Sequence, residues 1–107
     1  MAQGEKCGLD CGSGTEIDTV APTVIHTVPV ADPGKNRGHY IHLDLINSGN
    51  NATDVTLVAD GLTMVISVPT KSTQQIDFFV LCTAVAQEVT AQAAAADVFA
   101  LGFHEHW

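Results

Sequence analysis

The alternation of apolar and polar residues in HYIHLDLIN (39–47) constrains the fold of this chain more than any other feature. Ile41, Leu43 and Leu45 fall on one side of an extended chain, and polar residues occupy the positions between them. A helix would scatter these apolar residues around its axis, because its period is 3.6 rather than 2. The pattern therefore predicts a strand of an antiparallel sheet with one face buried.

Comparable segments recur along the chain and are separated by turn residues such as Pro33-Gly34 and Asp60-Gly61. They are DTVAPTVIHTVPV, TDVTLVADG, LTMVISVPT and QQIDFFVLC. In the last of these, Phe79 and Leu81 make the second face apolar as well. We therefore expect that strand to run through the middle of the protein or to lie under a partner.

The alanine-rich segment 83–97 is compatible with either a helix or strands. Thr83 lacks the Glu or Gln three residues later that a capping box requires, and QEVTAQA and DVFALGFH both alternate, so we favour strands. The whole pattern predicts an all-β fold, an antiparallel β-sandwich or jelly roll of about seven short strands. Residues 17–107 form this domain, and the glycine-rich residues 1–16 are expected to be a flexible N-terminal arm.

The balance of charge excludes several classes of partner. Twelve acidic residues against four basic ones give the chain of 107 residues a formal net charge of −8. Such a surface repels phosphate backbones and anionic lipid headgroups, so we expect no nucleic-acid and no membrane partner. The N-terminus lacks the apolar run of a signal peptide, which predicts a chain made in the cytosol.

The cysteines and histidines are the candidate metal ligands. Cys7 and Cys11 lie four positions apart in CGLDCGSG, without the second matched pair that structural zinc sites use. We therefore expect no metal and no other cofactor, and we interpret this stretch as a loop of the arm. The alternative is a metal site formed by Cys7, Cys11, His104 and His106, because His104 and His106 share one face of an extended segment.

No pattern of residues points to catalysis. Ser13 lies in GSG without the strand-turn-helix context of a nucleophile elbow, and the spacing of the cysteines does not match a catalytic dithiol. We expect the protein not to be an enzyme and name no catalytic residue.

Three segments carry a resemblance to a known class of proteins: INSGNNATDVTLVADG, LTMVISVPTKSTQQIDF and VTAQAAAADVFALGFHE. Their order is strand, turn, strand, a Val-Pro ending with a Lys-Ser-Thr turn, and a closing Gly-aromatic pair. This order resembles the small β-sandwich accessory proteins of tailed-bacteriophage virions, which include capsid decoration (cement) proteins. The stretch CGLDCGSG has no counterpart in that pattern.

The resemblance implies a structural protein that self-associates, with a trimer favoured, and binds the major capsid protein or another shell protein. Its location would be the virion, after assembly in the cytoplasm of the host bacterium. Aromatic residues contribute much of the binding energy at interfaces, so the expected contacts between subunits are Phe79, Phe99, Phe103 and Trp107. Glu5 and Asp10 of the arm are expected to meet basic patches on the shell. The alternative function is a soluble metal- or ligand-binding β domain that uses Cys7, Cys11 and histidines.

Overall fold

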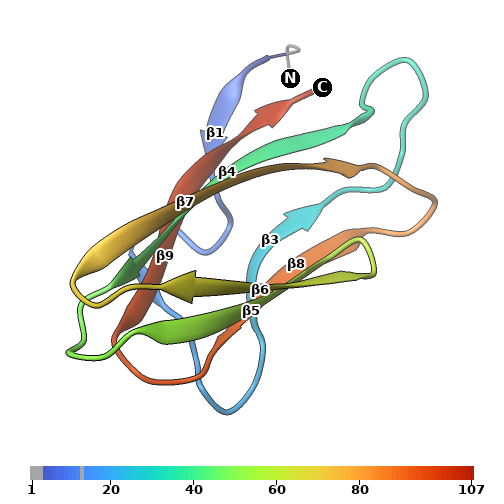
Figure 1. Cartoon of the computed structure of the whole chain (residues 1–107). Coiled ribbons are helices and arrows are strands. Elements are labelled where there is room, and N and C mark those ends of the chain that lie inside the picture. Colours follow the sequence, from blue (N-terminus) through green and yellow to red (C-terminus); the bar gives the residue numbers. More distant parts are fainter. Residues whose placement is uncertain (1–3, 13) are drawn as a thin grey trace.

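The computed structural model describes residues 4–12 and 14–107, which form nine β-strands in two antiparallel sheets (Figure 1). Ser13 lies outside the described residues. The strands are β1 (Lys6–Gly8), β2 (Thr15–Glu16), β3 (Thr23–Val28), β4 (Gly38–Asn47), β5 (Thr53–Ala59), β6 (Leu62–Val68), β7 (Ser72–Leu81), β8 (Gln87–Ala93) and β9 (Val98–His106). The all-β prediction and the preference for strands after residue 83 are confirmed. The described residues contain no helix long and apolar enough to cross a membrane.

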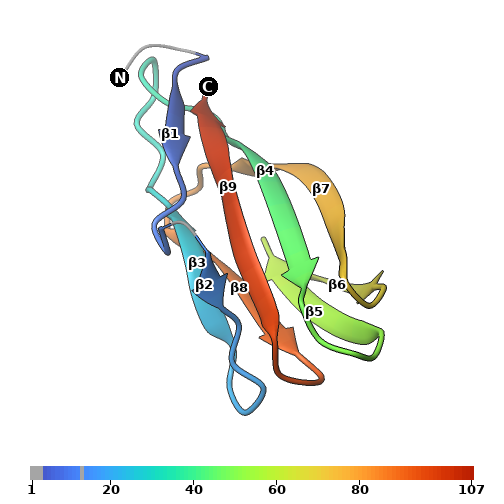
Figure 2. The ribbon, with the colours of Figure 1, turned by 90° about the vertical axis from the view of Figure 1, so that its left-hand side faces the viewer.

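The two sheets face each other as the layers of a sandwich (Figure 2). The first, here the β4 sheet, has the order β1-β9-β4-β7, with β2 also paired to β9. The second, the β5 sheet, has the order β3-β8-β5-β6. Strand β1 and the last residues of β9 lie side by side at one end of the sandwich (Figures 1 and 2).

The core lies between the sheets and is formed by the inward positions that the alternation predicts. Ile41, Leu43 and Leu45 of β4 are fully buried, as are Val55 and Leu57 of β5. Small residues complete the core from β8 and β9, where larger side chains would separate the sheets: Ala91, Ala93 and Ala100. Burial of this apolar surface is the main favourable contribution to folding.

One close approach of two backbones requires glycine. Gly102 of β9 pairs with Leu43 of β4 and has a φ of 152°, a conformation that other residues rarely adopt. A Cβ atom at this position would collide with the carbonyl oxygen of His42. The glycine therefore allows β9 to remain paired with β4 up to its last residues, which contribute to the site described below.

Strand β7 contradicts one of the two positions expected for QQIDFFVLC, the one in the middle of the protein, and leaves the other, under a partner, as a prediction. It is an edge strand of the β4 sheet and does not run through the middle of the protein. Its inward residues Ile76 and Phe78 pack on the core, whereas Phe79 and Leu81 are 42% and 55% exposed. The apolar second face of this strand therefore lies on the surface.

The described part of residues 1–16 also differs from a flexible arm. Strand β1 pairs with β9 through Cys7 and His104, and β2 pairs with β9 through Thr15 and Ala100. Leu9 lies in the core with only 4% of its surface exposed. The free edge of β9 offers hydrogen bonds to these residues, and burial of an apolar side chain stabilises the pairing, so the segment extends the β4 sheet.

A β-bulge in β3 decides which of its residues face inward. Val24 pairs with Thr90 and His26 with Val89, which leaves Ile25 as an extra residue in β3. The bulge turns Ile25 and His26 both toward the interior, whereas Val24 is 42% exposed. Simple alternation would place Val24 and His26 on the same side, so the sequence pattern did not identify His26 as a buried residue.

Candidate metal centre

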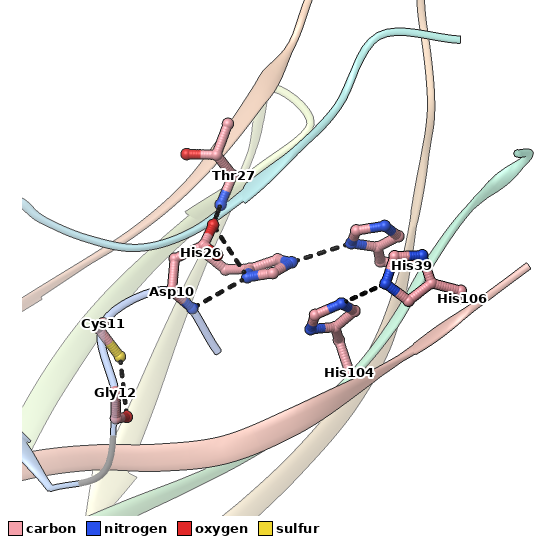
Figure 3. Close-up of polar contacts among 8 residues, drawn as sticks. All are labelled: Asp10, Cys11, Gly12, His26, Thr27, His39, His104 and His106. Carbon is pink, nitrogen blue, oxygen red and sulfur yellow. Dashed lines mark hydrogen bonds and ion pairs between the residues drawn. The ribbon is translucent and has the colours of Figure 1, made fainter. Parts of the chain in front are cut away.

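Four histidines gather at one end of the sandwich (Figure 3), and Cys7, which Figure 3 does not draw, lies beside two of them. They come from four strands of both sheets: Cys7 from β1, His26 from β3, His39 from β4, and His104 and His106 from β9. We call this group the histidine cluster.

The register of the β4 sheet explains the part of the cluster that belongs to it. His106 lies directly opposite His39, and His104 lies opposite Ile41 on one side and Cys7 on the other. Residues directly opposite each other on neighbouring strands project to the same face of a sheet. The inward direction of Ile41 therefore fixes the direction of the three histidines and of Cys7.

The imidazole rings are in direct contact with one another. Nε2 of His26 lies 2.9 Å from Nδ1 of His39, and Nε2 of His104 lies 2.7 Å from Nε2 of His106. The rings of His39 and His104 stack with their centroids 4.4 Å apart. Each nitrogen pair forms a hydrogen bond only when one ring donates and the other accepts, which neutral imidazoles satisfy.

Burial leaves some ring nitrogens of the cluster without a partner. His26, His39 and His104 are 1%, 3% and 5% exposed. Nε2 of His39 and Nδ1 of His104 have no hydrogen-bond partner among the described residues. An unsatisfied buried polar atom costs about 1–3 kcal/mol, so the cluster is an unfavourable filling for a core unless something binds these nitrogens.

Burial favours the neutral form of the His39 and His104 imidazoles. The pKa of His39 is lowered to about 4, mainly by burial and in addition by the neighbouring His104, His106 and His26. Burial likewise lowers the pKa of His104 to about 4, with added effects of His26 and His106. A neutral imidazole has a lone pair available for a metal ion, so these rings are in the protonation state that metal binding needs.

Asp10 holds His26 from outside the cluster. One carboxylate oxygen of Asp10, Oδ2, lies 3.3 Å from Nδ1 of His26 and accepts a hydrogen bond of 2.8 Å from the backbone N–H of Thr27. The backbone N–H of Asp10 also lies 3.3 Å from Nδ1 of His26. This N–H donates to Nδ1, which cannot at the same time donate to the carboxylate. Metal binding through Nε2 requires the tautomer with the proton on Nδ1, in which the Asp10 carboxylate accepts from that N–H, as is usual around metal-ligating histidines.

Two overlapping sets of residues have the spacing of metal ligands. Cys7, His104 and His106 form the first set, and His26, His39 and His104 form the second, with ligand atoms all within 4.8 Å of one another in each. Ligand atoms around tetrahedral zinc are separated by roughly 3.3 Å, given bonds of about 2.0 Å. The ligand atoms of either set would have to approach one another by at most about 1.5 Å to reach that separation.

The sequence predicted part of this group. The alternative metal set contained Cys7, His104 and His106, which the fold brings together, and Cys11, which belongs to neither set. Burial raises the pKa of the Cys11 thiol, and its Sγ contacts the carbonyl oxygen of Gly12. None of the three described cysteines forms a disulfide.

Two histidines of the cluster were missed as ligands. His26 is turned inward by the bulge of β3, and His39 is placed by the pairing of β4 with β9. The inward direction of His39 was available from its alternation with Ile41. No local pattern in the sequence revealed that β3 would bring His26 to the same point.

The aromatic residues expected at a subunit interface lie elsewhere. Phe79, Phe99 and Phe103 lie at outward positions of β7 and β9, and the Phe103 ring stacks on His42 with centroids 4.4 Å apart. Trp107, next to Gly4, is 41% exposed. The backbone carbonyl of Glu5 accepts a hydrogen bond from the backbone N–H of His106. Asp10, the other acidic residue expected to meet a shell, contacts His26, and its side chain is 57% exposed.

Comparison with known proteins shows the fold alone. No protein-family model and no curated protein sequence matches the chain. Among solved structures, the chain is similar to an exo-β-1,3-galactanase of Phanerochaete chrysosporium, with a TM-score of 0.52 and 11% identity, over 98% of this chain. It spans only 26% of that galactanase chain. A family 35 carbohydrate binding module from an environmental isolate aligns with a TM-score of 0.49 and 15% identity, over 99% of this chain and 88% of the module.

Proposed function

We propose that this protein is a metal-binding β-sandwich domain that holds one transition-metal ion of the zinc type between its sheets. The observation that carries the proposal is the convergence of three buried imidazoles, His26, His39 and His104, from both sheets. Two of these rings have a nitrogen without a hydrogen-bond partner among the described residues. Imidazole is a suitable ligand for zinc, copper, nickel and iron, and unsuited to calcium and magnesium.

The role of such an ion would be structural. His26 belongs to the β5 sheet, whereas His39 and His104 belong to the β4 sheet, so one ion would join the two layers. Catalytic zinc sites keep a coordination position open to substrate, but the rings of this set are at least 95% buried. The ion would therefore stabilise the fold, because the unfolded chain offers no preformed site.

The test is a titration of metal-free protein with zinc, followed by native mass spectrometry and calorimetry. We expect one ion per chain and a rise in melting temperature that a chelator reverses. The variants His104→Gln and His39→Gln should each lower zinc affinity by on the order of 100-fold, because a ligand contributes at least as much as an outer-shell residue.

His42→Gln is the matched control, because His42 lies on the same strand as His39 but faces outward, where it contacts Asp77. This variant should bind zinc as the wild type does. Absence of stoichiometric zinc in the wild type, or equal losses in His42→Gln and His39→Gln, would contradict the proposal.

We propose as a second candidate a structural role in a virion shell, as a capsid decoration protein that self-associates. The specific observation in its favour is the apolar outer surface of the β4 sheet. Phe79 and Leu81 lie on its edge strand β7, and Phe103 lies on β9. Exposed apolar patches on a small domain commonly mark an interface. A metal ion in the core is compatible with this role.

Native mass spectrometry at several protein concentrations tests the second candidate. A closed oligomer, for which a trimer is favoured, should be lost in Phe79→Asp. Val65→Asp is the control, because Val65 is 64% exposed on the β5 sheet. A monomeric wild type, or loss of the oligomer in the control alone, would count against an interface on the β4 sheet.

A further inference from the structure

The two ligand sets of the histidine cluster differ in chemistry and in origin. The set of His26, His39 and His104 contains only imidazoles and links both sheets. The set of Cys7, His104 and His106 contains a thiol and belongs wholly to β1 and β9. His104 is common to both sets, so its ring is a candidate ligand in either one.

The charge of the ligands distinguishes the two sets as sites for a divalent ion. A divalent ion surrounded only by neutral imidazoles leaves two positive charges in a buried site, which is costly without anionic partners. The described chain places two groups there that can be anionic: the Cys7 thiolate as a ligand, and the Asp10 carboxylate 3.3 Å from Nδ1 of His26. The Cys7 thiolate would neutralise one of these charges as a direct ligand in the set with His106, whereas Asp10 lies beside His26 of the other set.

Both of these groups come from the same short segment. Cys7 lies in β1, and Asp10 follows two residues after its end. This segment is held to the sandwich by the pairing of β1 with β9, by the buried Leu9 and by the hydrogen bond between Asp10 and Thr27. An ion bound to Cys7 would add a fourth attachment, directly to β9.

We propose that Cys7 is a thiolate ligand of the ion and that metal binding fastens residues 6–10 to the end of the sandwich. This inference rests on the proposed metal-binding function and specifies the ion as one that accepts sulfur together with imidazole nitrogen, such as zinc. Zinc and cobalt(II) meet this requirement. On binding, the S–H bond of Cys7 breaks, its proton leaves to solvent, and the sulfur donates its electron pair to the metal without any change of oxidation state.

Cobalt(II) is the probe that reports sulfur coordination directly. Metal-free wild-type protein titrated with cobalt(II) should develop a near-ultraviolet thiolate-to-metal charge-transfer band that saturates at one equivalent. Cys7→Ser should lose this band and bind zinc on the order of 100-fold more weakly. Cys11→Ser is the matched control, because Cys11 lies in the same segment but outside both ligand sets, and it should keep the band.

Hydrogen exchange provides a second measurement that does not depend on the spectrum. Zinc should slow exchange of the backbone amides of residues 6–10 in the wild type and in Cys11→Ser, but not in Cys7→Ser. Cys7 is only partly buried, and serine has nearly the same shape, so metal-free Cys7→Ser should show the exchange pattern of the metal-free wild type.

The outcomes separate this inference from the proposed function. Stoichiometric zinc binding without a charge-transfer band, and with unchanged affinity in Cys7→Ser, would overturn the thiolate ligand but leave an all-imidazole site in place. Loss of the band in Cys11→Ser alone would also overturn it. Absence of any metal binding by the wild type would overturn both.

Discussion

The space between the two sheets is filled in two different ways. Over most of its length it contains apolar side chains in close contact, such as Leu43, Leu45, Leu57 and Val98, all fully buried. At the end where β1, the start of β4 and the last residues of β9 meet, it contains the histidine cluster. The same sheets and the same inward positions therefore present two kinds of interior.

The comparison shows that burial has different consequences for the two fillings. An apolar side chain gains free energy from burial whatever surrounds it, at about 25 cal/mol for each Å². A buried imidazole gains only if both of its nitrogens find partners. The apolar region should therefore contribute stability under all conditions, whereas the contribution of the histidine cluster should depend on pH and on metal.

Acid should produce the largest difference between the two regions, because it should lower the contribution of the histidine cluster to the free energy of unfolding and leave that of the apolar region unchanged. In metal-free protein the pKa values of His39 and His104 are about 4, whereas their ordinary value is 6.5. Between these values the unfolded chain binds more protons than the folded one, so stability decreases as pH falls from 6.5 and levels off below 4. The facing groups are His26 and His106, which lower these pKa values, and Asp10, which opposes the shift.

The expected loss is at most about 3 kcal/mol for each imidazole, from the size of the shift. Urea unfolding of metal-free protein at a series of pH values between 7 and 4 measures it. The variant His104→Leu should show a smaller loss over the same range. A pH dependence identical in wild type and variant would refute the assignment to the cluster.

Truncation of a side chain in the apolar region should lower the free energy of unfolding by a similar amount. This decrease should not depend on metal. Leu57→Ala leaves a cavity opposite the β4 sheet and should lower the free energy of unfolding by about 2–5 kcal/mol. The decrease should be the same with and without saturating zinc, because Leu57 belongs to neither ligand set. A decrease that disappears in zinc would mean that the two regions are not independent.

Removal of the carboxylate beside His26 should weaken metal binding by a smaller amount. Asp10→Asn keeps the shape of the side chain but loses the charge that balances the ion. Zinc affinity should fall about 10–100-fold, as for other outer-shell partners of metal-ligating histidines. Asp32→Asn is the control, because the side chain of Asp32 is as exposed as that of Asp10, at 57%. Equal affinities of the two variants would exclude a specific role of Asp10.

The smallest expected effect is an increase in the stability of the metal-free protein. His104→Leu in metal-free protein at pH 7 replaces a ring with an unpartnered buried nitrogen by an apolar side chain of similar size. Stability should rise by about 1 kcal/mol, because an unsatisfied polar group is removed, while zinc binding is lost. His42→Leu on the outer face should give no such gain, since it removes the contact with Asp77. A loss of stability in His104→Leu would show that the cluster is well satisfied without metal.

The sequence by itself determined the fold class and the inward faces of most strands. Alternation in residues 39–47 correctly separated His39, Ile41 and Leu43 from His42, because the direction of a side chain in a regular strand depends only on its parity. The same argument placed His104 and His106 on one face. The absence of a capping box at Thr83 correctly favoured strands over a helix in the alanine-rich segment.

Only the tertiary structure decided which of these faces meet. His26 enters the cluster through a bulge that shifts the register of β3 against β8, and Cys7 enters because β1 pairs with β9. Pairings between residues nearly 100 positions apart leave no local pattern, since they depend on the free edge of β9 and on the burial of Leu9. The spacing of Cys7 and Cys11 left a shared metal site only as the alternative to a loop. In the fold Cys11 belongs to neither ligand set, whereas Cys7 lies beside histidines at the far end of the chain.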